Sequence, residues 1–202
     1  MSPKRQGTKH QGTDETVARI LAEALRVHAE RGHEGFTMRA VIAATGMSSG
    51  SLYHHFGSFD GLAAALYARC MAELLDALLE VLDDGADPRP GIEAAARAYL
   101  RFTRERGDAA RFVHASAYAA FLPEHAAVIA ASKAPRMERL IAWVAPHVAA
   151  GRVARLSPAM MEMLLVGPLA ETARRWLSDP ASADLDEAAA VLPGRIWRSL
   201  QP

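Results

Sequence analysis

The feature that most constrains the fold is the stretch 35–56, where two short helical segments stand on either side of a glycine. Thr37 is a suitable N-cap for a helix over Met38 to Ala44, and Ser48 is a suitable N-cap for a second short helix. Gly46 stands between them and permits a tight turn. Helices this short are marginal alone, so the pattern predicts that they are held by packing.

The two faces of the second segment differ in chemistry. Leu52 and Phe56 are four residues apart and share one face, where they are expected to anchor the helix. In the first segment, Ala43 is small enough to allow a close helix crossing. The opposite face of the second segment is polar, with Ser49, Gly50, Ser51, Tyr53, His54 and His55. A helix with small polar residues at its N-terminal end enters the major groove of DNA without clashing, so a helix-turn-helix is predicted.

Helical periodicity extends over the rest of the chain, and no segment shows the alternation expected of a strand. A helix is expected from the N-cap Thr13 to about Gly32, and a leucine-rich one from Ser58 to the turn at 83–85. Further helices are expected over 91–106, 108–121, 124–148, 158–178 and 184–200. A kink is expected at Gly167-Pro168 and an interruption at Pro193-Gly194. The predicted fold class is all-α.

Residues 13–67 closely resemble the DNA-binding region of the tetracycline-repressor (TetR) family of transcriptional regulators. The resemblance rests on the arrangement of Ile42, Ala43, Gly46, Ser48, Gly50, Leu52, Tyr53, His55 and Phe56. It implies three parts: a basic arm over 1–12 that is disordered without DNA, an N-terminal three-helix helix-turn-helix domain over 13–60, and a helical ligand-sensing and dimerisation body over 61–202.

The resemblance also implies which residues contact DNA. Thr37 would bind a phosphate while capping its helix, and Arg39 would contact a phosphate or a base. Contacts with base edges are implied for Ser49, Gly50 and Ser51, backbone contacts for Tyr53 and His55, and a part in sequence preference for His54. Ser48 is also expected to contact DNA. The alternatives are that Tyr53 and His55 are partly packed and that Ser48 acts only as a cap.

Two positions depart from the family pattern. Where the family often begins the next helix with a lysine and an acid, this chain has Phe59 and Gly61. Phe59 makes no ionic phosphate contact, while Gly61 lowers helix propensity and removes the usual capping-box acid. The basic arm with Lys9 would compensate by neutralising phosphates, or it would be only a solubilising tail. In the second case the affinity for DNA would be modest.

The body contains candidates for an effector site. The candidates are six bulky residues on predicted helices: Phe102, Phe112, His114, Tyr118, Trp143 and Met163. Aromatic and methionine side chains line adaptable apolar cavities, but the same residues also serve as ordinary core. The histidines and acids lack metal-ligand spacing, so no metal or cofactor is expected.

Dimerisation is expected because one recognition helix reads only a few base pairs, whereas two related by a two-fold axis read a pseudo-palindromic double-stranded DNA operator. The resemblance implies pairing through the last two long helices. The functional hypothesis is a homodimeric repressor released from its operator by a small, largely apolar ligand. A regulator without sensing and a helical lipid-binding module are the alternatives.

Composition excludes several other classes. The chain has 202 residues, zero formal net charge and half of its residues apolar, which is typical of a globular protein. No apolar run reaches the roughly 20 residues that span a bilayer, and the basic N-terminus lacks a signal core, so a cytoplasmic protein is expected. Cys70 is the only cysteine, which excludes an internal disulfide framework. No catalytic triad or phosphate-binding glycine loop is found, so no enzyme activity is expected.

Overall fold

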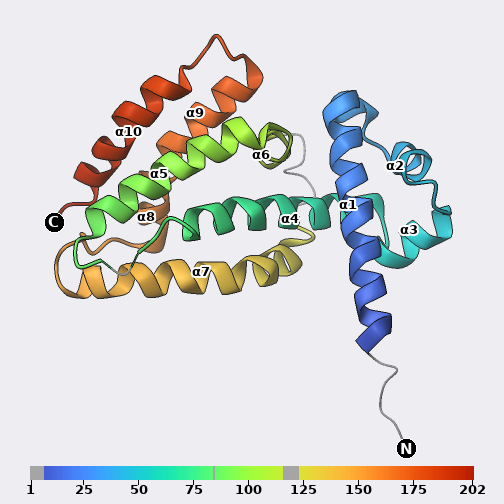
Figure 1. Ribbon diagram of the computed structural model, residues 1–202, viewed down its shortest axis with the longest axis horizontal. Coiled ribbons are helices and arrows are strands. Elements are labelled where there is room, and N and C mark those ends of the chain that lie inside the picture. Colours follow the sequence, from blue (N-terminus) through green and yellow to red (C-terminus); the bar gives the residue numbers. More distant parts are fainter. Residues whose placement is uncertain (1–6, 84, 116–122) are drawn as a thin grey trace, which may run out of the picture. The chain divides into compact units, whose positions relative to one another are not determined.

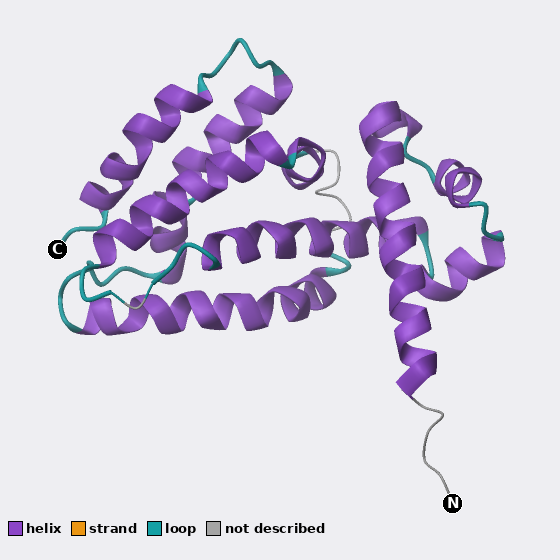
Figure 2. Ribbon diagram, viewed as in Figure 1, coloured by secondary structure: helices purple, strands orange, loops and turns teal. Residues whose placement is uncertain are grey.

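The computed structural model describes residues 7–83, 85–115 and 123–202, and every regular element among them is a helix (Figure 2). The predicted all-α fold is therefore confirmed. The helices are α1 (Gly7–Gly35), α2 (Met38–Thr45), α3 (Ser49–Phe56), α4 (Phe59–Leu79), α5 (Pro88–Glu105), α6 (Gly107–His114), α7 (Ala126–Ala149), α8 (Pro158–Leu165), α9 (Gly167–Ser178) and α10 (Leu185–Ser199) (Figure 1). The chain divides into two compact units, and the division after Tyr67 falls inside α4.

The first unit contains α1, α2, α3, the start of α4 and, from later in the chain, the first residues of α7 up to Ile129. The apolar stripe of α1 is buried at helical spacing, as expected for one face of an amphipathic helix. The helices α2, α3 and α4 also contribute to the core of this unit, whose buried aliphatic side chains include Ile20, Leu21, Val27, Val41, Leu52, Leu62 and Leu66. Burying a side chain of this size contributes roughly 1.5–3 kcal/mol, so this shared core holds the short helices in place.

The second unit is built around α5, which packs along α10 and also contacts α6 and α9. Tyr99 and Phe102 of α5 are buried, as are Phe112 of α6 and Ile196 and Trp197 of α10. These residues form the apolar interior of the body. The three tryptophans of the chain all belong to this unit.

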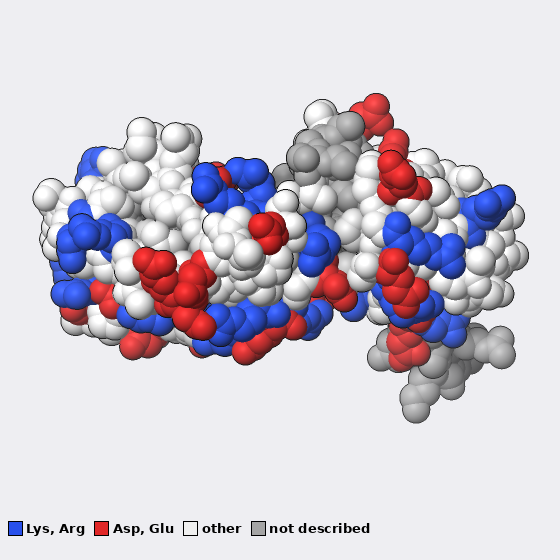
Figure 3. All heavy atoms as spheres, turned by 90° about the horizontal axis from the view of Figure 1, so that it is seen from above, with Lys and Arg blue, Asp and Glu red and all other residues white. Residues whose placement is uncertain are grey.

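Ion pairs attach the second half of α4 to other helices of the body. The two nitrogens Nε and Nη2 of Arg136 on α7 donate to the carboxylate of Asp76, at 2.8 and 2.7 Å. Glu73 accepts from Arg106, which follows α5, at 2.5 Å and from Arg69 at 3.2 Å. Acidic and basic side chains are interspersed on the face drawn in Figure 3, in keeping with the zero net charge.

Several helix boundaries differ from the prediction. The first helix begins at Gly7, so Thr13 lies inside it and is not its N-cap. The helix expected from residue 91 begins at Pro88, because Asp87 accepts a hydrogen bond from the Arg89 amide and proline is well suited to the first helical turn.

The C-terminal helices show three further differences. The helix predicted to reach residue 121 ends at His114, and residues 116–122 lie outside the described part. The single helix expected over 158–178 is divided at Val166, and this break falls where the kink at Gly167-Pro168 was predicted, because the proline has no amide to donate. The interruption predicted at Pro193 is wrong: α10 continues through it, and Pro193 is itself fully buried.

Candidate nucleic-acid interface

The first helix of the motif is capped as predicted. Thr37 has an extended backbone, and its hydroxyl oxygen accepts from the Ala40 amide at 3.2 Å. At the other end, Gly46 takes the left-handed conformation with φ of 67°, and its amide donates to the Ile42 carbonyl. A residue with a Cβ rarely adopts this conformation, so the tight turn depends on glycine here.

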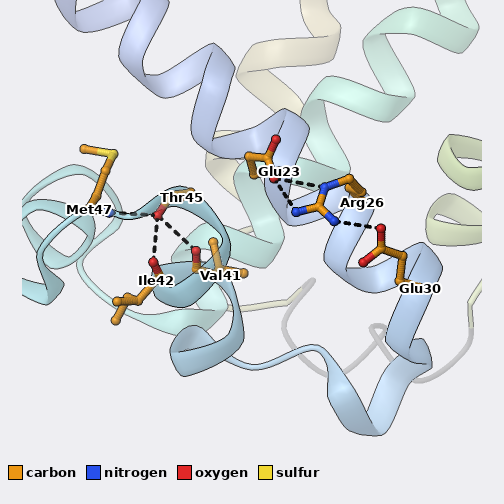
Figure 4. Close-up of polar contacts among 7 residues, drawn as sticks. All are labelled: Glu23, Arg26, Glu30, Val41, Ile42, Thr45 and Met47. Atoms are coloured by element: carbon orange, nitrogen blue, oxygen red, sulfur yellow. Dashed lines mark hydrogen bonds and ion pairs between the residues drawn. The ribbon is translucent and has the colours of Figure 1, made fainter.

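Thr45 completes the turn and was missed by the sequence analysis. Its hydroxyl lies within hydrogen-bonding distance of the Val41 and Ile42 carbonyls, at 3.0 and 3.2 Å, and accepts weakly from the Met47 amide at 3.4 Å (Figure 4). The hydroxyl thus gives the Met47 amide, just beyond the end of α2, a hydrogen-bond partner and adds a side-chain contact to the last carbonyls of the helix. The sequence signal for this role of Thr45 is a threonine directly before the turn glycine.

The second helix of the motif, α3, is capped by Ser48, whose hydroxyl accepts from the Ser51 amide at 3.3 Å. Leu52 is fully buried and Phe56 is half-buried, which confirms that these residues anchor the helix. By contrast, Ala43 is exposed and Ala40 is the small buried residue of α2, so the predicted role of Ala43 in close packing is wrong.

The face of α3 opposite Leu52 is turned outwards. Tyr53 is 50% exposed, which is high for a tyrosine with an apolar ring. Ser48, Ser49, Gly50 and His54 are also exposed, whereas Ser51 and His55 are half-buried. The residues selected from sequence therefore lie on one short helix and its cap, with hydroxyl, phenol and imidazole groups available to a partner.

Thr37 and Arg39, at the N-terminus of α2, are exposed as well. Arg39 has no carboxylate partner among the described residues, unlike Arg26 on α1, which is paired with both Glu23 and Glu30 at 2.7 Å (Figure 4). A free guanidinium beside a helix N-terminus suits phosphate oxygens. Lys9 belongs to a turn of α1 whose side chains lie outside the described part.

Phe59, one of the two departures from the family pattern, has a packing role. Its ring centroid is 5.1 Å from that of Phe36, and the Phe36 ring in turn meets His28 at 5.6 Å, edge to face. Such aromatic pairs contribute about 0.5–1.5 kcal/mol beyond their buried area. The start of α4 is thus fixed to the rest of the first unit by aromatic contact, in the place where the family often has a lysine.

The body residues selected from sequence are divided between core and surface. Phe102 and Phe112 are buried in the core of the second unit. His114 is paired with a residue that sequence analysis missed: its Nε2 lies 3.2 Å from the hydroxyl oxygen of buried Tyr99. Burial, and to a lesser extent the charge of Arg174, lower the pKa of His114 below its ordinary value of 6.5. This pair places polar groups beside the apolar core of the second unit, which also buries Thr103 and His147.

The lowered pKa of His114 predicts a pH dependence of stability. Near and below pH 6.5 the unfolded chain binds a proton at this histidine more readily than the folded chain, so folding stability falls as the pH is lowered. We expect the free energy of unfolding, measured with urea at pH 7.5 and 5.5, to fall less in His114→Gln than in the parent. His54→Gln, at an exposed histidine, is the control. Equal pH dependence in His114→Gln and the parent would contradict the assignment.

Trp143 is used in packing. A methyl group at Gly91 would lie 2.5 Å from Cζ2 of the Trp143 ring, so the indole occupies the space that the missing side chain leaves, and its Nε1 donates to the Asp83 carbonyl. Met163 is 64% exposed on α8, which buries no residue, and so it lies outside the interior where it was expected. Tyr118 lies outside the described residues.

An open pocket of about 290 Å³ lies elsewhere on the body, between the ends of α5 and α9 and the start of α10. Arg104 on its wall is paired with Asp186 at 2.6 Å. None of the five described candidates, Phe102, Phe112, His114, Trp143 and Met163, lines this pocket. Burial raises the pKa of the Cys70 thiol to about 12, which makes it a packing residue and not a nucleophile.

A capped two-helix motif held by a third helix, followed by a helical body, defines a helix-turn-helix protein. Residues 20–66 match the profile of the bacterial regulatory proteins of the tetR family. The HTH-type transcriptional repressor AcnR of Corynebacterium glutamicum is 41% identical over 61 residues, which cover 30% of this chain and 32% of that protein. The chain therefore matches about a third of the length of this relative.

Two longer matches extend over the body. The HTH-type transcriptional activator FasR of Mycolicibacterium smegmatis is 25% identical over 93% of this chain and 84% of its own length. A solved TetR-family transcriptional regulator from Pectobacterium atrosepticum is 28% identical, with a TM-score of 0.67 over 95% of this chain and 96% of that one. Residues 20–66 therefore belong to the DNA-binding region of the TetR family, and the whole chain is similar to solved regulators of that family.

Proposed function

We propose that this protein is a sequence-specific DNA-binding transcriptional regulator that reads DNA with α3. The proposal rests on the outward face of that helix, where Ser49, Gly50, Tyr53 and His54 are exposed. Leu52, on the opposite face, is fully buried and anchors the helix. Small groups at the N-terminal end of the helix allow close approach to base edges. Thr37 and Arg39 would then contact the phosphate backbone, which sets register and affinity.

The regulator would act as a homodimer. Two copies of α3 related by a two-fold axis would read successive major grooves about 34–36 Å apart. Met160, Met163 and Val191, on α8 and α10, are large apolar residues that stand exposed in the single chain. A second copy of the chain, docked against the last helices, would cover them.

The effector would be a small, largely apolar molecule with at least one hydrogen-bonding group. The hydroxyl of Tyr99 or the imidazole of His114 would form a hydrogen bond with that group. Both lie in the unit whose apolar core contains Phe102 and Phe112. Such a ligand lowers the affinity for DNA only to the extent that it binds the conformation unable to bind DNA more tightly than the conformation that binds DNA. Repression is proposed as the mode, and a ligand titration that never changes operator affinity would favour a regulator without sensing.

We propose that the protein binds DNA and an effector and catalyses no reaction. It would act in the cytoplasm, where bacterial DNA lies. Among the described residues, no helix is long and apolar enough to cross a membrane. Turnover of a substrate abolished by a single change in the body would support an enzyme instead. A helical lipid-binding module would be favoured by tight lipid binding in a folded dimer that recovers no DNA motif.

The first test is selection from a randomised duplex pool at about 150 mM salt, where attachment through phosphates alone is suppressed. Recovery of a pseudo-palindrome by the purified protein would support a dimeric operator binder. A folded dimer that retains no motif would overturn the DNA-binding proposal. Placing the recovered site upstream of a reporter promoter would then distinguish repression from activation.

Arg39→Ala gives a prediction for phosphate contact. Removing one phosphate contact is expected to lower affinity for all duplexes and to reduce the slope of log affinity against log salt by about one. The measurement is a fluorescence anisotropy titration of the selected duplex at four salt concentrations. Arg26→Ala is the control, because Arg26 is already neutralised by Glu23 and Glu30. An unchanged slope in Arg39→Ala would show that Arg39 contacts no phosphate.

A further inference from the structure

The connection between α3 and α4 is a glycine-dependent junction. Gly57 has φ of 71° and ψ of −44°, and the Ser58 amide donates to the Phe56 carbonyl at 2.8 Å across it. This is a three-residue γ-turn of the positive-φ type, which is rare and strained for residues with a Cβ. The chain therefore reverses direction within three residues at the C-terminal end of the recognition helix.

Gly61 makes the second half of this junction possible. A Cβ at this position would lie 2.0 Å from the Phe56 carbonyl oxygen and 3.2 Å from its carbonyl carbon. Both are backbone atoms at the end of α3, so no side-chain rotation relieves the overlap. The Gly61 amide also donates to the Ser58 hydroxyl at 2.9 Å, which fixes the first turn of α4 against the same point.

The two sides of the junction differ in how firmly they are held. The first turn of α4 is anchored by the contact of Phe59 with Phe36 and by Leu62, which is fully buried. The recognition helix α3 buries only one residue fully, Leu52. If atoms are forced into the junction, α3 is the element that moves, because it has the smaller buried surface to lose.

We propose that Gly57 and Gly61 are positioning residues for DNA reading: together they set the angle at which α3 leaves α4. They touch no DNA in this role, and they act through the placement of Ser49 to His54. The effect of the two glycines on DNA reading rests on the proposed function. Their effect on the placement of α3 rests only on the geometry of the first unit. It also gives a role to Gly61, which by helix propensity alone is an unfavourable residue at that point.

The test compares each glycine with a matched glycine from the body. Gly61→Ala is matched by Gly107→Ala, since Gly107 is also helical and a Cβ there meets nothing within 4 Å. Gly57→Ala is matched by Gly151→Ala, because both have positive φ and open surroundings. The Gly57→Ala and Gly151→Ala pair introduces no steric overlap with other residues, so it still tests the proposal if Gly61→Ala fails to fold.

Two readouts are measured. Hydrogen exchange followed by mass spectrometry reports on the peptides of α2 and α3, and we expect exchange in α3 to become about tenfold faster in the junction variants with α2 unchanged. Anisotropy reports on two duplexes, the one selected by the parent and a shuffled duplex of the same composition. We expect affinity for the selected duplex to fall about tenfold or more, with affinity for the shuffled duplex at low salt unchanged.

The outcomes separate this inference from the function on which it rests. Unchanged exchange in α3 for both junction variants, relative to their matched controls, would overturn the inference whatever the DNA data show. Faster exchange in α3 with equal losses on both duplexes would also overturn it, because that is the result of general unfolding. If the parent selects no duplex, the DNA-binding proposal fails, and the exchange comparison still decides whether the glycines place α3.

Discussion

Leu52→Ala is expected to abolish specific DNA binding while leaving the body of the protein folded. Leu52 is fully buried and is the only residue of α3 that is. Truncating a buried leucine to alanine costs about 2–5 kcal/mol, through lost transfer energy and the cavity left behind. That loss falls on a unit whose short helices have little stability of their own, so α3 should leave the core of the first unit for much of the time.

The measurement uses the uneven distribution of tryptophans. Because all three lie in the second unit, tryptophan fluorescence reports on the body, while hydrogen exchange over α3 reports on the first unit. We expect unchanged fluorescence at 25 °C, fast exchange in α3 and no retention of the selected duplex. Leu52→Met keeps the volume and should cost less than about 1.5 kcal/mol, with binding retained. A Leu52→Ala protein that binds as the parent does would show that α3 is held by other contacts.

The helix-turn-helix could be predicted from sequence because its determinants are local. Thr37, Gly46 and Ser48 each act within three or four residues, through a cap or a positive-φ turn, and the structure places all three as expected. The fold class could also be predicted, since helical periodicity extends along the chain. Ala43 is the exception, because which small residue faces the neighbouring helix depends on the rotation of α2, and a single turn of apolar residues does not determine that.

The features that sequence reasoning missed depend on residues distant along the chain. From the sequence alone, Phe59 is only a departure from the family pattern. Its packing role becomes clear from its contact with Phe36, on the loop before α2. The Tyr99 hydroxyl meets His114 only because α5 and α6 pack together. Neither pairing leaves a periodic signal within one helix, so both require tertiary structure.

Helix boundaries were mispredicted where proline was treated only as a breaker. Pro88 begins α5 because it is in the first turn, where its missing amide costs nothing, and Asp87 caps the helix. Pro193 lies inside α10 without ending it, because this residue and the following Ile196 and Trp197 are buried. The packing of α10 on α5 outweighs the loss of one backbone hydrogen bond, which local sequence rules do not include.

Phe112→Ala is expected to give the largest loss of stability in the body, about 3–5 kcal/mol. Phe112 is fully buried on α6. The size of the loss distinguishes the two roles that sequence left open for this residue. A core phenylalanine leaves a new cavity when truncated and costs the full amount, whereas one that already lines an open effector site has fewer contacts to lose.

The decisive measurement is urea unfolding followed by tryptophan fluorescence, for Phe112→Ala and for Phe112→Leu as a control of intermediate volume. If Phe112 is core, the cavity in Phe112→Ala is dry and apolar, and a saturating small aromatic such as benzene should restore part of the lost stability by binding the folded state alone. The parent should gain no stability from benzene. A loss below about 1.5 kcal/mol, together with stabilisation of the parent by benzene, would instead assign Phe112 to the wall of a preformed site beside the Tyr99–His114 pair.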